Sequence, residues 1–199
     1  ALLEPVSAAQ TQRWLTELPQ DLRSREATLR ATMEAFTALR ELRVGDVVAV
    51  PLFIPHALQH GVRTVEFQTP VYERKILSFA QKVLTQDHWD TDEALQLAHL
   101  QTPADEAFPQ ISNANGVVIE QIVAFEDFTV QRIFLEPGAK VTCELGQQYG
   151  LLMGVSGQVA CEGVLIDAEQ AVLFPASANC VSVTNAQQIN AVMLLARPV

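Results

Sequence analysis

The chain has 199 residues, of which 49% are hydrophobic and 18% are charged, and this composition excludes wholesale disorder. Its net charge of −10 disfavours binding to nucleic acid, which requires a basic surface. No apolar run has membrane-spanning length and no signal-peptide pattern opens the chain, so we expect no membrane association and a cytoplasmic location. The three cysteines lack metal-ligand spacing and are expected to be reduced thiols.

Residues 1–43 are predicted to form a helical segment. A first helix is expected to break at Pro19, and a second to open near Ser24. Apolar side chains of the second helix form one stripe at three- and four-residue spacing: Leu29, Met33, Phe36, Leu39 and Leu42. Such a stripe indicates packing in a core rather than contact with a cofactor. Gly45 follows at a position where a left-handed helix cap is favoured.

Residues 44–100 are predicted to form a partial β half-barrel with a short helix. The β-rich runs occupy residues 44–50, 62–67 and 71–79. Asp90 and Glu93 then mark the start of a short helix that runs to Leu100. Residues 101–116, QTPADEAFPQISNANG, are rich in turn-forming residues and are predicted to be a linker.

Residues 117–199 are predicted to form a second β domain. Its short β-rich runs are separated by turn residues, namely Pro137, Gly138, Gly150, Gly154, Gly157 and Gly163. This pattern is typical of an antiparallel sandwich or barrel.

Residues 45–60, GDVVAVPLFIPHALQH, contain the most informative motif in the chain. After Gly45, five residues lead to a proline, four more lead to His56, and three more lead to His60. This spacing resembles the second signature of the cupin β-barrels, in which a Gly-Asp turn and a strand precede a histidine that faces the barrel interior. The chain departs from the signature at Phe53, where cupins prefer glycine, and at His60, where they prefer asparagine. The resemblance implies that His56 ligates zinc or another divalent metal.

The sequence that follows, HALQHGVRTVEFQTPVYERKILSF, resembles the matching stretch of type I mannose-6-phosphate isomerases. In that family a Pro-His-Ala run supplies a zinc ligand, a Glu-x-Gln strand comes next, and an arginine follows a short loop. The resemblance implies that His56 binds the metal and that Glu66 and Gln68 line the substrate pocket. It also implies that Arg74 stabilises the oxyanion at the substrate carbonyl, although the interval before this arginine is shorter than in the family.

Charge and strand geometry leave several roles open for these residues. Lys75 forms a local positive cluster with Arg63 and Arg74, which permits a phosphorylated substrate, and we assign Lys75 to the substrate site. Glu66 and Gln68 share one face of their predicted strand, which is either an outward polar face or the wall of a wet barrel lumen. Arg74 could instead form a surface salt bridge, and His56 could simply hydrogen-bond a neighbour.

The second β domain resembles a cupin whose metal ligands have been replaced. The spacing after Gly138 is that of the first cupin signature, which places two histidines and a glutamate where Glu144, Gly146 and Gly150 stand. The same counting places Cys180 at the remaining histidine position. Two glycines cannot ligate a metal through side chains, so this domain is expected to be a metal-free structural module.

The isomerase family takes its other metal ligands from a Gln-x-His pair and a glutamate that precede the helical segment, and His56 is the first histidine here. We therefore expect that the chain is a C-terminal fragment of a longer isomerase-like protein. The alternatives are a natural half-protein that completes its barrel in another way, and domain swapping between two chains, which would complete the sheet but not supply the missing ligands. A homodimer is expected to cover the sheet edge left open by the missing strands.

The implied fold class is mainly β, a cupin (RmlC-like jelly roll) with a helical N-terminal segment and a second, degenerate cupin. The implied function is the metal-dependent interconversion of an aldose phosphate and a ketose phosphate, as in mannose-6-phosphate isomerase. The alternative is a non-catalytic cupin that binds a sugar or another small ligand, or a structural half-barrel. With one expected metal ligand, the chain alone should have little or no isomerase activity.

Overall fold

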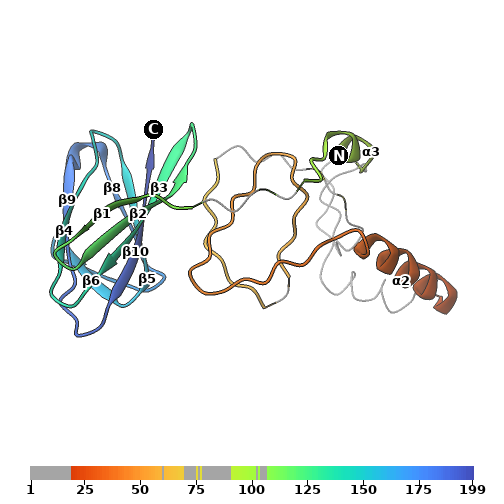
Figure 1. Ribbon diagram of the computed structural model, residues 1–199, viewed down its shortest axis with the longest axis horizontal. Helices are drawn as coiled ribbons and strands as arrows, with labels where there is room; N and C mark the ends of the chain where they lie inside the picture. Colours follow the sequence, from red (N-terminus) through yellow and green to blue (C-terminus); the bar gives the residue numbers. More distant parts are fainter. Residues whose placement is uncertain are drawn as a thin grey trace, which may run out of the picture. The chain divides into compact units, whose positions relative to one another are not determined.

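The computed structural model describes residues 19–59, 61–69, 75, 77, 91–101, 103 and 107–199. The chain divides into two compact units, Ala1–Pro103 and Ala104–Val199, and each is considered by itself (Figure 1). The division falls inside the predicted linker, residues 101–116. The linker prediction is wrong at its C-terminal end, because β1 (Gln110–Ala114) pairs there with β2 (Val117–Ala124).

The first unit contains helix α2 (Gln20–Glu34), which begins directly after Pro19 rather than near Ser24. It ends at Glu34 because both the backbone N–H and the hydroxyl of Thr37 donate to the Glu34 carbonyl, at 3.0 and 2.8 Å. Gly45 is therefore too distant to cap this helix, and the cap prediction is wrong. No helix among the described residues is long and apolar enough to span a membrane.

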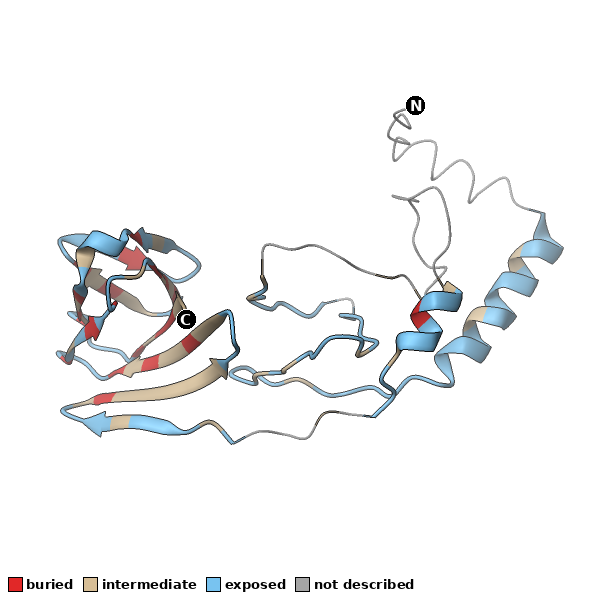
Figure 2. Cartoon of the chain, turned by 90° about the horizontal axis from the view of Figure 1, so that it is seen from above, coloured by how far each residue is buried: buried red, intermediate tan, exposed pale blue. Residues whose placement is uncertain are grey.

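Most of the apolar stripe predicted to pack in a core is exposed instead, and Leu42 is partly buried. None of the residues of α2 is buried, as Figure 2 shows along the length of the helix. Leu29 is 57% exposed and Phe36, which lies beyond the helix end, is 88% exposed. The helix is charged or polar around most of its circumference, so the stripe is too narrow to bury.

The predicted strands at residues 44–50 and 62–67 are absent, since the described part of this region is irregular. The Gly-Asp turn itself forms: the Asp46 N–H donates to the Arg43 carbonyl at 3.0 Å, the Arg43 N–H donates to the Asp46 carboxylate at 2.9 Å, and Gly45 has a φ of 96°. A β-rich sequence pattern alone does not form a strand, because the backbone N–H and C=O groups of a strand need a neighbouring strand as hydrogen-bond partner. The half-barrel predicted over residues 44–100 is therefore wrong for these two runs.

Two further predictions for the first unit have different outcomes. The short helix expected over residues 90–100 is confirmed as α3 (Thr91–Leu97), whose Ala94 is buried. The third predicted strand, residues 71–79, lies almost wholly outside the described residues. The sheet edge that a second copy was expected to cover is not found in the described residues of 44–69.

The second unit is a jelly roll built from two antiparallel sheets (Figure 1). In spatial order the larger sheet contains β1, β2, β3 (Phe128–Leu135), β10 (Ala191–Pro198), β5 (Gly150–Ser156) and β8 (Ala171–Phe174). The smaller sheet contains β4 (Lys140–Glu144), β9 (Cys180–Thr184), β6 (Gln158–Cys161) and β7 (Val164–Asp167). The C-terminal strand β10 lies between β3 and β5, an order reached only by long crossings between the sheets. This is the cupin type of jelly roll, so the prediction of a mainly β, cupin-like fold is confirmed, and the jelly roll that is present is the one predicted as the second, degenerate cupin.

The core of the second unit lies between the two sheets. Alternate residues of each strand point inward, including Ile133 and Leu135 on β3, Val183 on β9 and Leu195 on β10, all at most 1% exposed. The inner space is filled by apolar side chains, and their burial supplies the main stabilisation of this unit.

Candidate functional site

His56 adopts a geometry that suits a metal ligand. Its Nδ1 lies 2.8 Å from the carbonyl oxygen of Ile54, and its side chain is exposed. Because a carbonyl oxygen can only accept, the proton of the neutral ring is on Nδ1, and the lone pair is on Nε2. Metal-binding histidines have this arrangement, since a hydrogen bond to one ring nitrogen fixes the tautomer that ligates through the other.

The described residues do not complete a metal site around His56. Zinc sites in proteins use three or four protein ligands, and the described part of the chain contains no group of three or more His, Cys, Asp or Glu side chains that could hold a metal ion. His56 therefore fits as one ligand, and the set as a whole does not fit zinc.

The other predicted site residues are not assembled into a pocket. Glu66 and Gln68 are both exposed and lie in irregular backbone, so the predicted strand that would have placed them on one face is missing. The ammonium group of Lys75 lies 2.9 Å from the carboxylate of Glu93 on α3. Arg74 and His60 lie outside the described residues.

The second unit shows a different register from the one deduced from the first cupin signature. Glu144 and Cys180, assigned to ligand positions by counting, are cross-strand partners and are both exposed. The inward positions on these strands belong to their neighbours Cys143, Leu145 and Val181, which are at most 6% exposed. A shift of one residue moves every side chain to the opposite face. The lumen of this jelly roll is therefore lined by apolar groups and two buried thiols, those of Cys143 and Cys161.

Burial makes two of the three thiols poor nucleophiles. Desolvation raises the pKa of Cys143 to about 11, with smaller contributions from Cys161 and Glu144 that exceed the opposing effect of Arg197. Desolvation, followed by the charge of Glu162, also raises the pKa of Cys161 to about 11. Cys180 is exposed, and the structure has all three cysteines as free thiols.

We expect a thiol reagent at pH 8 to label Cys180 in the native chain and to label Cys143 and Cys161 only after unfolding. Both buried thiols have pKa values of about 11, above the ordinary value of 9.0, so the unfolded chain ionises first. Their contribution to stability is complete below pH 9 and is lost as the pH rises to about 11. Ellman's reagent and urea unfolding across this range measure both effects. Cys180→Ser should abolish native labelling and keep the pH dependence, whereas rapid native labelling of all three thiols would contradict the assignment.

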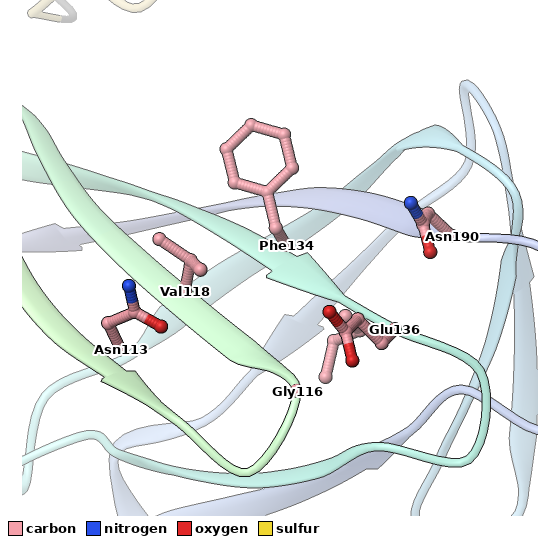
Figure 3. A pocket seen from close by; sticks show the side chains of 7 residues that line it. Asn113, Gly116, Val118, Phe134, Glu136 and Asn190 are labelled. Atoms are coloured by element: carbon pink, nitrogen blue, oxygen red, sulfur yellow. The ribbon is translucent and has the colours of Figure 1, made fainter.

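A pocket of about 290 Å³ lies on the second unit, on the face of the larger sheet that points away from the core (Figure 3). Asn113, Val118 and Phe134 form its floor as direct neighbours across β1, β2 and β3. Its other lining residues are Gly116, Leu135, Glu136 and Asn190. The sequence patterns did not indicate this site, because its residues come from four separate segments.

A fully buried asparagine, Asn185, holds two walls of this pocket together. Its side-chain NH2 donates to the carbonyls of Leu135, Glu136 and Ile189, at 3.0, 3.1 and 2.8 Å. The first two carbonyls belong to the end of β3 and the residue after it, and the third belongs to the residue before Asn190. The polar wall residues Glu136 and Asn190 are thus attached to one buried anchor.

No protein-family model and no curated protein matches the sequence. Among solved structures the chain is similar to a sugar phosphate isomerase of the cupin superfamily from Silicibacter pomeroyi, with 18% identity, covering 42% of this chain and 60% of that chain, at a TM-score of 0.37. It is also similar to an RmlC-like cupin from Shewanella frigidimarina, with 10% identity, covering 46% of this chain and 83% of that chain, at a TM-score of 0.39. The chain is also similar to KdgF from Halomonas sp., with 12% identity, covering 47% of this chain and 87% of KdgF, at a TM-score of 0.38. The jelly-roll assignment rests on the sheet topology, and these likenesses say nothing about activity.

Proposed function

We propose that this chain functions in a metal-dependent sugar-phosphate isomerase of the mannose-6-phosphate isomerase type. The observation that carries the proposal is the His56 imidazole, which lies within the Pro-His-Ala run and whose Nδ1 is bonded to the Ile54 carbonyl. In this proposal the jelly roll of the second unit contributes no catalytic group, because apolar side chains occupy its lumen.

The remaining roles follow from the resemblance to the isomerase family. Arg74 would stabilise negative charge on the carbonyl oxygen of the open-chain sugar, while a base moves the proton at C2. Glu66, Gln68 and Lys75 would contact the substrate. His56 would be one ligand of a metal, and the other ligands would come from side chains outside the described residues or from a second polypeptide.

Zinc binding by the purified chain should depend on His56. We expect His56→Ala to weaken zinc binding by roughly tenfold or more, about 1.4 kcal/mol, as measured by equilibrium dialysis. His99→Phe is the matched control, because the His99 ring packs edge-to-face on Phe53 with centroids 5.8 Å apart and phenylalanine retains that contact. Equal zinc affinity in wild type and His56→Ala would contradict the assigned ligand.

Turnover provides a second readout of the same proposal. Mannose 6-phosphate incubated with the zinc-loaded chain should show little or no conversion by NMR, because one described ligand does not preform a metal site. Robust conversion that His56→Ala abolishes would place the missing ligands within this chain and would overturn the expectation of weak activity.

The second candidate is a non-catalytic jelly roll that binds a sugar or another small ligand. The pocket on the larger sheet favours it, since polar side chains and an aromatic ring meet there. The homodimer also stays a prediction, and sedimentation of the purified chain at micromolar concentration would reject it by showing a strict monomer.

A further inference from the structure

The lining of the pocket on the larger sheet offers hydrogen-bonding groups of both kinds around one aromatic ring. Asn113 and Asn190 each provide an amide that donates and accepts, and Glu136 provides a carboxylate that accepts. Phe134 is half-buried, and Figure 3 shows it beside Val118 above the polar groups. This combination of ring and planar polar side chains suits a ligand with hydroxyl groups on one side and C–H groups on the other.

The charges around the pocket select against ionic ligands. Its lining residues include no lysine, arginine or histidine, and the guanidinium next to Phe134, that of Arg132, is already paired with Glu120, so a phosphate group would face the Glu136 carboxylate. A cationic ligand would be repelled by the Arg132 guanidinium, whose carbon lies 5.4 Å from the Phe134 centroid. Arg132 is itself fixed by Glu120 at 2.8 Å. A neutral ligand avoids both costs.

The pocket is held open by contacts that do not involve its polar side-chain tips. The Glu136 N–H donates to the Gly116 carbonyl at 2.8 Å, which joins the end of β3 to the β1–β2 turn. Gly116 also leaves room for the carboxylate, because a Cβ there would lie 3.0 Å from Glu136 Oε2. Asn185 attaches the opposite wall through the Ile189 carbonyl. Preorganisation of this kind lowers the cost of binding.

We propose that this pocket binds a neutral saccharide, with one hexose ring stacked on Phe134 and its hydroxyl groups bonded to Asn113, Glu136 and Asn190. Its volume, about 290 Å³, is at the small end of ligand pockets and matches one sugar unit rather than a chain. The inference deepens the second candidate function, ligand binding by the jelly roll, and rests on it; it involves no residue of the proposed metal site and does not rest on the isomerase function.

The test is a titration of the full chain with D-mannose and with D-glucose, followed through the side-chain amide NMR signals of Asn113 and Asn190. At least one neutral sugar should shift both signals saturably, with a dissociation constant on the order of 1 mM. Phe134→Leu and Glu136→Ala should each weaken binding by about tenfold or more, corresponding to the loss of one principal contact. Phe134→Trp should retain binding, because it keeps an aromatic face.

Two control variants show whether the sugar binds at this pocket. Glu126→Gln removes a carboxylate from an exposed turn outside the pocket and should leave the sugar affinity unchanged. His56→Ala should also leave it unchanged, so that failure of the metal proposal and failure of this one are distinguishable. The inference is overturned if neither sugar shifts the two signals, if choline shifts them instead, or if mannose 6-phosphate binds tenfold more tightly than mannose.

Discussion

Replacing Asn185 with alanine should lower the free energy of unfolding of the jelly-roll unit by about 3 kcal/mol or more. Asn185 is 0% exposed, and its NH2 group donates to three carbonyls of two different segments. Its Oδ1 accepts the backbone N–H of Gln187 at 3.0 Å. Alanine leaves all four backbone groups without these partners, and each buried group that stays unpaired costs about 1–3 kcal/mol.

Urea unfolding followed by circular dichroism measures this loss. Asn113→Ala is the matched control, since Asn113 is an exposed asparagine on β1 and its removal should change stability by about 0.5 kcal/mol or less. Asn185→Asp keeps the size and the acceptor but removes the donors, so it should be destabilised as well. A midpoint for Asn185→Ala that matches wild type would show that water replaces the amide, contrary to our expectation.

Gly154→Ala should destabilise the jelly roll by roughly 3 kcal/mol, because the added methyl group has no space. A Cβ at this position would lie 2.3 Å from the carbonyl oxygen of Asp167 and 2.9 Å from its carbonyl carbon. These are backbone atoms, and they cannot move freely. The Gly154 N–H donates to the Gln170 carbonyl at 2.9 Å, and the Glu169 N–H donates to the Gly154 carbonyl at 2.8 Å.

Gly163→Ala separates the effect of space from that of backbone conformation. Gly163 has a φ of +82°, and no atom lies within 4 Å of the place that a methyl group would take, so its substitution should cost only the conformational term, about 1 kcal/mol. The same urea unfolding experiment compares the two variants. Equal losses for both would mean that the 167–170 segment yields easily, and the steric explanation for Gly154 would be wrong.

Local sequence carried enough information to predict the second unit as a β domain. Strands alternate between inward and outward residues, and turns favour glycine, so short-range patterns report both features. The sequence also contains an Asn-Gly pair, Asn115 and Gly116, which is typical of a two-residue hairpin turn. Both residues have a positive φ, 55° and 74°, in the hairpin that joins β1 to β2. Read as a hairpin turn, this pair would have removed residues 110–116 from the predicted linker.

The direction in which each strand faces was decided by packing. Counting from Gly138 placed Glu144, and counting from Pro175 placed Cys180, at ligand positions of the cupin signatures, yet the residues that are buried are their neighbours. Spacing between residues does not specify which face of a strand meets the opposite sheet. The burial of Leu145 under Gly150, where a Cβ would come within 2.7 Å of Leu145 Cδ2, settles that register.

The first unit shows the same division between local and tertiary information. The local sequence was enough to predict the Gly-Asp turn at residues 45–46 and to identify His56 as the candidate ligand, because both depend on residue type at a short spacing. It could not determine whether residues 44–50 and 62–67 pair as strands, since the partner of a strand comes from elsewhere in the fold. The pocket formed by Asn113, Phe134 and Asn190 likewise depends on contacts that form only in the folded chain. Only the tertiary structure, which brings the hydrogen-bond partners and the facing side chains together, decided these features.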